Sequence, residues 1–149
     1  HGDFGPGSYV RNPPGSRHTP ASALGCTIFV KLRQMRDDGS EPLVQTDTSK
    51  GEWVSAGAPG YERQILFAPE DGREFVALER LAPNRKIAVR SLPGGEEILV
   101  LEGCLRQGGQ AHSPGSWIRN PPGAGFDLGT GPEGGCTFWV KRGHLPPPI

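Results

Sequence analysis

The chain has 149 residues, of which 34% are hydrophobic and 7% aromatic, and its 16 basic residues balance its 16 acidic residues. This length suits one ordinary domain or slightly more, and the balanced charge argues against binding to nucleic acids or to anionic membranes, because both depend on an excess of basic residues. No apolar run approaches the roughly 18 residues of a membrane-spanning helix, and residues 1–8 lack the basic and apolar parts of a signal peptide, so we expect a soluble protein.

Short apolar runs bounded by turn residues follow one another along the chain. The 23 glycines and 16 prolines separate these runs, and bounded runs of this kind are typical of β-strands. In chain order, strands are expected at residues 8–11, 27–32, 53–54, 63–68, 73–81, 86–90, 96–105, 116–119 and 137–141. The polar stretch 35–50 is expected to be a linker, and the proline-rich residues 146–149 a short extended tail. The predicted fold class is all-β.

One sequence unit occurs twice. GSYVRNPPG at residues 7–15 returns as GSWIRNPPG at 115–123, and GCTIFVK at 25–31 returns as GCTFWVK at 135–141. Each copy predicts a short strand, a Pro-Pro-Gly corner, a polar loop and a second strand, because a Pro-Pro pair cannot continue a central strand.

The two copies differ in what precedes them. Several expected strands lie within residues 51–114, ahead of the second copy, whereas only residues 1–6 precede the first. Two strands alone bury too little surface to be stable. We therefore expect residues 1–34 to be the C-terminal part of a first domain whose upstream half is absent from this chain, and residues 51–145 to be a complete second domain.

The repeat carries the second half of the cupin signature, which is Gly, five residues, Pro-x-Gly, two residues and His. The first copy matches it with Gly7, Pro13, Gly15 and His18, and the second matches it with Gly115, Pro121 and Gly123 but has Phe126 in place of the histidine. On these residues the chain resembles the cupins, and within them the ChrR-type cupin of anti-sigma factors and of some small-molecule dioxygenases. The resemblance covers nearly the whole chain, and it implies a tandem of RmlC-like jelly-roll barrels, one partial and one complete.

The first half of the signature is degenerate in the second barrel. It reads Gly, five residues, His-x-His, three or four residues, Glu, six residues and Gly. When Glu96 and Gly103 are matched to its last two positions, Arg90 and Leu92 stand at the two histidines and Asn84 at the leading glycine. In metal-bearing cupins three imidazoles and one carboxylate hold a divalent metal, and neither a guanidinium nor a leucine can replace an imidazole as a ligand. The resemblance thus implies a second barrel without a metal.

Glu96 and His18 are the two remaining residues of the metal pattern. Glu96 alone would be an uncompensated charge in an apolar barrel, so we predict that Arg90, which is aimed at the same interior, pairs with it. His18 is in the right place to be the last ligand of a divalent metal, Zn or Fe, in the first barrel. Its partner ligands would then be absent from this chain.

The three cysteines, Cys26, Cys104 and Cys136, are an odd number and form no CxxC pair. This spacing supports neither a disulfide framework nor a cysteine zinc site, and it favours a reducing, cytoplasmic setting. Cys26 and Cys136 hold equivalent positions in the two repeats, and we interpret them as small buried hydrophobic residues.

Two functions remain open from the sequence. The first is a regulatory or sensory role in transcription control, as in ChrR-type anti-sigma factors, with any metal in the first barrel. The alternative is a metal-dependent dioxygenase or isomerase with its active site there. The partners expected are a second copy of the chain in a homodimer, a small molecule in the barrel, and a sigma factor contacted through regions outside this chain.

Overall fold

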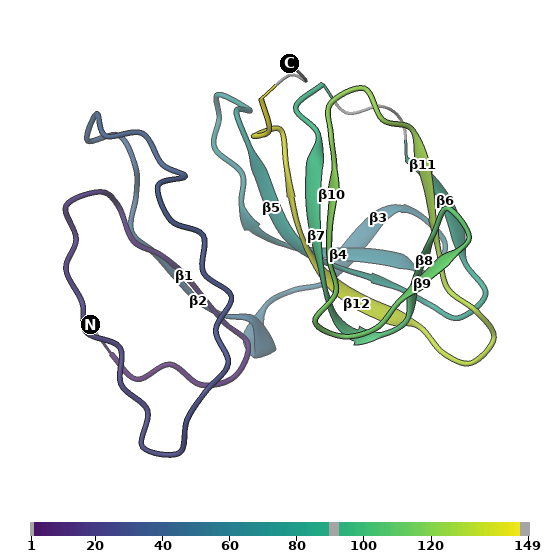
Figure 1. Cartoon of the computed structure of the whole chain (residues 1–149), viewed down its shortest axis with the longest axis horizontal. Coiled ribbons are helices and arrows are strands. Elements are labelled where there is room, and N and C mark those ends of the chain that lie inside the picture. Colours follow the sequence, from purple (N-terminus) through teal and green to yellow (C-terminus); the bar gives the residue numbers. More distant parts are fainter. Residues whose placement is uncertain (1, 90–92, 147–149) are drawn as a thin grey trace. The chain divides into compact units, whose positions relative to one another are not determined.

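The computed structural model describes residues 2–89 and 93–146, which form twelve strands and one short 3₁₀ helix (Figure 1). The bounds are β1 Ser8–Arg11, β2 Val44–Asp47, η1 Thr48–Lys50, β3 Val54–Ala58, β4 Tyr61–Phe67, β5 Phe75–Leu81, β6 Lys86–Val89, β7 Glu96–Gly103, β8 Leu105–Gln107, β9 Gln110–His112, β10 Trp117–Asn120, β11 Phe126–Gly129 and β12 Cys136–Arg142. No helix in this part of the chain is long and apolar enough to cross a membrane. The predicted all-β class is confirmed. The chain divides into two compact units, residues 1–51 and 52–149.

The second unit consists of two antiparallel sheets. The larger sheet has the strand order β10-β7-β12-β5-β4-β3, and the smaller has the order β6-β11-β8-β9. Strands far apart in the sequence are neighbours in space: β12, the last strand, lies between β5 and β7. Two facing sheets with crossed connections of this kind form a jelly roll, as the resemblance to cupins implies.

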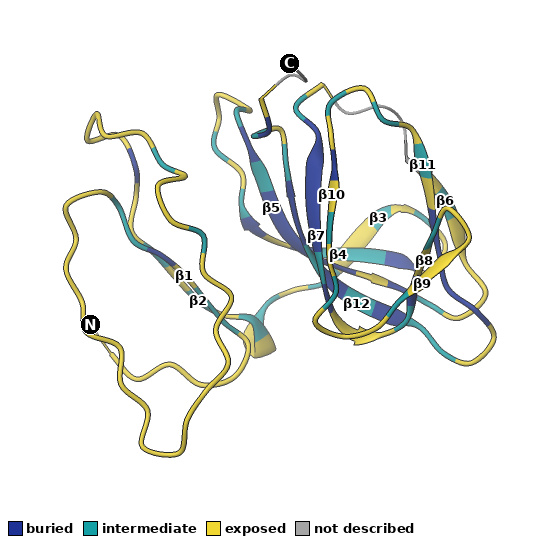
Figure 2. Cartoon of the chain, viewed as in Figure 1, coloured by how far each residue is buried: buried dark blue, intermediate teal, exposed yellow. Residues whose placement is uncertain are grey.

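Side chains from both sheets form one hydrophobic core. Phe138 and Ile98 enter it from the larger sheet, and Leu105 and Leu128 enter it from the smaller; all four are fully buried (Figure 2). Side chains alternate between the two faces of a strand, so on β12 the inward row of Phe138 and Val140 continues to Arg142. This row places an arginine inside the barrel.

Gly103 marks the point where the chain passes from one sheet to the other. We expected a single strand over 96–105, but the structure divides it into β7 in the larger sheet and β8 in the smaller. Gly103 has a φ of 75°, and a Cβ added there would collide with the carbonyl oxygen of Gly135. A glycine is required at this crossing because no other residue fits both the conformation and the space.

The other strands predicted for the second unit form close to their expected places. β9 and β11 were not predicted, because each is short and neither presents an apolar run. Asn84, at the leading glycine position of the cupin signature, has a φ of 55°. Asparagine adopts this left-handed conformation more readily than most residues, so the loop keeps its shape without the glycine.

The first unit contains only one ladder among its described residues, in which β1 pairs antiparallel with β2 from Ser8 opposite Asp47 to Arg11 opposite Val44. Within this unit, Arg11 also forms a buried ion pair with Glu41, at 2.6 Å. The stretch 35–50, which we expected to be a linker throughout, therefore supplies a strand and the helix η1. The difference arises because β1 takes its partner from this stretch.

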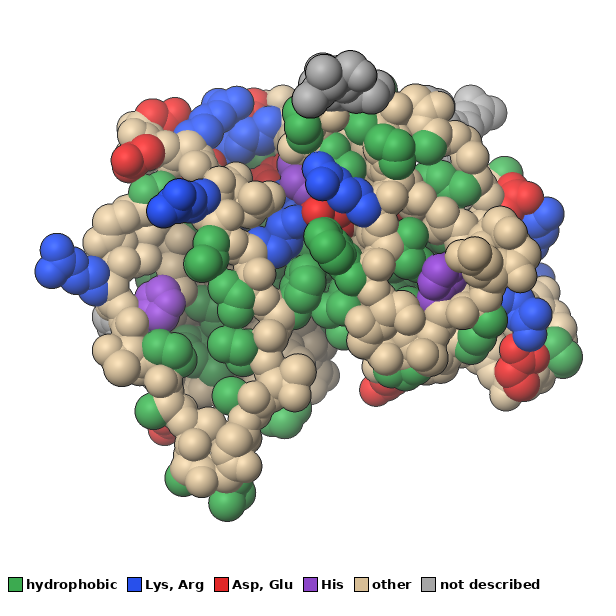
Figure 3. All heavy atoms as spheres, viewed as in Figure 1, with side chains coloured by type: hydrophobic (Ala, Val, Ile, Leu, Met, Phe, Trp, Pro, Cys, Tyr) green, Lys and Arg blue, Asp and Glu red, His purple; other side chains and the backbone are tan. Residues whose placement is uncertain are grey.

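The segment 27–32 does not form the strand that we expected. Its counterpart β12 is held on both sides by β5 and β7, and the described part of the first unit contains no equivalent of either strand. Apolar side chains of this segment are exposed, among them Ile28, Val30 and Leu32, and hydrophobic atoms are visible over this unit in Figure 3. A strand sequence without ladder partners stays irregular.

Candidate functional site

A continuous chain of polar side chains crosses the interior of the jelly roll formed by residues 52–146, which we call the second barrel. It runs from Tyr61 to Glu79, Arg142, Glu96, Asn120 and Gln107. The first five residues lie on β4, β5, β12, β7 and β10 of the larger sheet, and Gln107 lies on β8 of the smaller. The chain therefore connects the two sheets through the core.

Arg142 is the centre of this network. Its Nη1 and Nη2 donate to the two carboxylate oxygens of Glu79 at 2.6 and 2.8 Å, and its Nε donates to Oε2 of Glu96 at 2.9 Å. Both carboxylate side chains are fully buried, and the arginine side chain is 15% exposed. Charge-assisted bonds with this two-pronged geometry are among the strongest that side chains make.

The strand register explains how one arginine reaches both carboxylates. On β12, Arg142 stands directly opposite Glu96 of β7 on one side and Phe75 of β5 on the other. Glu79 lies four residues further along β5, with fully buried Ala77 on the same face between them. A methyl group at that position leaves room for the arginine side chain to extend over it.

Glu96 is held from two sides, since Nδ2 of Asn120 donates to its Oε1 at 3.3 Å and Nε2 of Gln107 donates to Oδ1 of Asn120 at 2.7 Å. Burial raises the pKa of Glu96, although Arg142 and Asn120 favour its charged form. Tyr61 donates its hydroxyl proton to Glu79, and burial, together with the charge of Glu79, raises the pKa of Tyr61 to about 12. Tyr61 is therefore a permanent donor at neutral pH.

Arg63 adds a second cation at the margin of this network. Its Nη2 lies 3.4 Å from Glu79, its guanidinium stacks over the rings of Tyr61 and Phe75, and its side chain is 29% exposed. Together with Arg142 and Glu96, these groups place two positive and two negative charges inside the barrel. Burial opposes the charge on Arg142, but the bonds and charges of Glu79 and Glu96 raise its pKa above the usual value.

The structure locates some of the residues predicted from the cupin signature. Glu96 is fully buried inside the barrel, and Phe126 packs against the hydrophobic core. Arg90 and Leu92 lie outside the described residues, and so does the predicted pair between Arg90 and Glu96. Among the described residues, the cation bonded to Glu96 is Arg142.

These residues do not fit a metal ion in the second barrel. Phe126 offers no lone pair where the signature has its last histidine, and Oε2 of Glu96 already accepts a bond from Arg142. No group of three or more His, Cys, Asp or Glu within the described residues could hold a metal. His18 lies in the first unit, where it is exposed to solvent.

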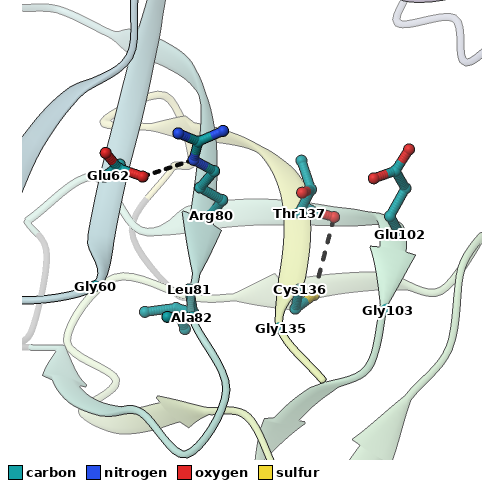
Figure 4. A pocket seen from close by; sticks show the side chains of 10 residues that line it. All are labelled: Gly60, Glu62, Arg80, Leu81, Ala82, Glu102, Gly103, Gly135, Cys136 and Thr137. Atoms are coloured by element: carbon teal, nitrogen blue, oxygen red, sulfur yellow. Dashed lines mark hydrogen bonds and ion pairs between the residues drawn. The ribbon is translucent and has the colours of Figure 1, made fainter. Parts of the chain in front are cut away.

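A separate surface groove of about 370 Å³ lies at the opposite end of β12 (Figure 4). Its charged residues include Glu62 and Arg80, which are joined by an ion pair of 2.7 Å. Cys136 also borders the groove, but its thiol is buried, and burial raises its pKa to about 12. Neither the ion pair nor this thiol is an activated group, so the groove does not resemble a catalytic centre.

Sequence reasoning singled out Glu96 but not Arg142, Glu79 or Tyr61. The signal for Arg142 was available: it continues the alternating inward row of β12 at the point where a polar residue is not expected. Glu79 could have been found in the same way, because it interrupts the apolar positions of β5 that face the core.

Comparisons with known proteins agree with this fold. A family model described as the ChrR cupin-like domain matches residues 1–36 and 41–146. A cupin-like protein of unknown function from Ralstonia eutropha JMP134 is 20% identical, with a TM-score of 0.59 over 64% of each chain. The polyketide cyclase RemF from Streptomyces resistomycificus is 24% identical, with a TM-score of 0.58 over 68% of this chain and 80% of that one.

A third similar structure is Rhodobacter sphaeroides SigE in complex with the anti-sigma ChrR. Its identity is 18% and its TM-score 0.54, over 62% of this chain and 50% of the matched chain. The chain thus spans less than two thirds of the Ralstonia protein and half of the chain from the SigE–ChrR complex. No curated protein matches it. At these identities the similar structures establish the cupin fold, and the family model, which matches most of the sequence, establishes that the chain belongs to the ChrR cupin-like domain family.

Proposed function

We propose that this chain is a regulatory cupin module, related in role to the cupin of ChrR-type anti-sigma factors, and that its second barrel acts without a metal. The observation that carries this proposal is that the carboxylate of Glu96 is already bonded by other side chains. Arg142 and Asn120 already bond to the one carboxylate that the cupin metal pattern retains, and Phe126 stands at the last ligand position. A barrel built in this way can bind a molecule or support an assembly, but its described residues form no open coordination site for substrate activation.

Partial exposure of the barrel interior supports a small-molecule ligand. Arg63, Ala56, Ile87 and Phe126 belong to inward-facing rows of their strands and are nevertheless only half-buried. Such a lining combines apolar contacts with one partly exposed cation, as ligand sites often do. The proposal includes a cytoplasmic location, a homodimer, and a sigma factor contacted through regions outside residues 1–149.

The position of His18 favours a second candidate function. It holds the last ligand position of the cupin signature in the first repeat. Ligands outside these 149 residues would then complete a site for a divalent metal, Zn or Fe. In that case the protein is a metal-dependent dioxygenase or isomerase, and the second barrel is its scaffold.

Deleting the gene in its host separates the two functions. A regulator changes the transcript levels of a sigma-dependent set of genes without accumulation of one metabolite, whereas an enzyme causes its substrate to accumulate. Complementation with the wild-type gene is the control. A metabolite that accumulates while the transcript profile stays unchanged would refute the regulatory proposal.

The metal-free state of the second barrel is tested on the purified full chain, which is stripped with a chelator and titrated with Zn²⁺ or, without oxygen, Fe²⁺. We expect the amount of bound metal to be the same for the wild type and for Glu96→Gln. A stoichiometric metal that is lost in Glu96→Gln would contradict the assignment.

A further inference from the structure

The two copies of the repeat differ at two positions that bear on the barrel interior. The matched segments 7–15 and 115–123 align His18 with Phe126, and the matched segments 25–31 and 135–141 align Leu32 with Arg142. The first copy thus combines His18 with Leu32. The second copy combines Phe126 with Arg142.

In the second barrel both positions face inward. Phe126 packs against the core, and Arg142 continues the inward row of Phe138 and Val140. The second barrel therefore holds a positive charge where the first repeat has leucine, and it has a phenylalanine, which cannot ligate a metal, where the first repeat has histidine.

We infer that Arg142 is a built-in cation that takes the structural place of a metal ion in the second barrel, an inference that rests on the metal-free barrel of the proposed function. Three of its nitrogens bond to three carboxylate oxygens from the two strands that flank β12. A divalent metal held there would likewise supply positive charge beside these carboxylates. The guanidinium does so permanently, because it does not lose its proton in proteins.

The charges explain why a cation is needed here. Glu79 and Glu96 are both fully buried and share one partner, so without Arg142 two like charges would remain in the core. Of these two carboxylates, Arg63 forms an ion pair with Glu79, at 3.4 Å, and it therefore compensates Glu96 poorly. A buried charge that loses its partner is strongly destabilising.

This role predicts that a metal can replace Arg142. The test uses the full chain with Arg142→Leu, which restores the residue found in the first repeat, and the double variant Phe126→His/Arg142→Leu, which restores both. We expect Arg142→Leu to lower the Tm by more than about 10 °C. Zn²⁺ should recover part of this loss, and more of it in the double variant, while the wild type responds to neither Zn²⁺ nor chelator.

The triple variant Glu79→Gln/Glu96→Gln/Arg142→Leu is the matched control, because it removes the carboxylates together with the cation. It should be more stable than Arg142→Leu and insensitive to Zn²⁺. This comparison holds even if Arg142→Leu does not fold without metal, since the triple variant is then the one that folds.

The outcomes test the built-in cation separately from the metal-free second barrel. If Zn²⁺ rescues neither Arg142→Leu nor the double variant, or if the triple variant is less stable than Arg142→Leu, the built-in cation is refuted while the metal-free barrel stands. If the wild type binds stoichiometric Zn²⁺ through Glu96, the proposed function of the second barrel fails as well.

Discussion

Three nitrogens of a single side chain, Arg142, hold the two carboxylates that are fully buried in the second barrel. This arrangement depends on the register between strands, which the propensities of single residues do not predict. Arg142 must stand opposite Glu96, and Ala77 must leave the space along which the guanidinium reaches Glu79. The cupin signature predicted Glu96, because that residue belongs to a contiguous motif. It could not predict the partner, which comes from a strand 46 residues away in the sequence.

Removal of the Tyr61 hydroxyl should weaken the network at its other end. Tyr61→Phe keeps the ring but takes away the donor to Glu79, and we expect a loss of about 1.5–3 kcal/mol because the acceptor is charged and buried. Urea unfolding of the full chain measures this loss. Gln110→Ala, at an exposed hairpin position, is the control and should stay within about 0.5 kcal/mol of the wild type; equal stability of the two variants would contradict the prediction.

The raised pKa of Glu96 predicts a particular pH dependence. Burial makes the folded state hold the carboxyl proton of Glu96 more tightly than the unfolded state does. The stability that this proton contributes is therefore fully present below the ordinary glutamate pKa of 4.5, and it is lost as the pH rises through the raised pKa of the folded state. Glu96→Gln does not titrate. The stability of this variant relative to the wild type should therefore increase from about pH 4 to about pH 8 in denaturant titrations, and a constant difference would show that the pKa is not raised.

The cysteines should differ in their reactivity toward iodoacetamide. Cys136 is buried with a pKa of about 12, so almost no thiolate forms at pH 8, whereas Cys26 is exposed. Peptide mass spectrometry after mild alkylation of the native full chain should find Cys26 modified and Cys136 unmodified. Alkylation in denaturant, where both must react, is the control. Equal labelling in the native state would contradict the burial of Cys136.

At the scale of the elements, β7 and β8 meet at Gly103, where the chain changes sheets. The sequence predicted one long strand across this point, because only Glu102 and Gly103 separate the apolar run 98–101 from Cys104 and Leu105. The glycine of the cupin signature was recognised as a motif position, but its physical reason lies in the backbone of Gly135, which is next to it only after folding. The remaining strands of this unit could be predicted because their apolar runs and turn residues are local signals.

Gly103→Ala should therefore disrupt this crossing. The left-handed φ of 75° and the contact with Gly135 act together, and we expect the variant to lose more than about 2 kcal/mol. Gly109→Ala is the matched control, because Gly109 has a φ of 83° but no atom within 4 Å of the added Cβ. Thermal unfolding compares the two. Equal losses would mean that the left-handed backbone conformation, and not the close approach of Gly135, requires a glycine at position 103.

At the scale of the whole molecule, the two repeats share two segments of similar sequence, and the second of these segments has a different structure in each repeat. The segment at β12 is an inner strand of the larger sheet, whereas its counterpart at 27–32 forms no strand and exposes the side chains that correspond to Phe138 and Val140. Sequence similarity identified the repeat but could not show this difference, because a strand is defined by the neighbours that accept its hydrogen bonds.

Limited proteolysis should detect this difference. We expect chymotrypsin to cut first near Leu24 and Leu32, which are 100% and 76% exposed, while residues 52–146 stay intact for longer because β4, β5, β7 and β12 are fully paired. Mass spectrometry of the fragments over time gives the order of cleavage. First cuts inside β5 or β12 would contradict the assignment of the stable unit.

The chain of polar groups from Tyr61 to Gln107 also has a consequence for how this protein is produced. All its components are encoded in the polypeptide. On the proposal that the second barrel acts without a metal, its folding is then independent of the concentrations of iron and zinc in the cell, and starvation for these metals would spare it.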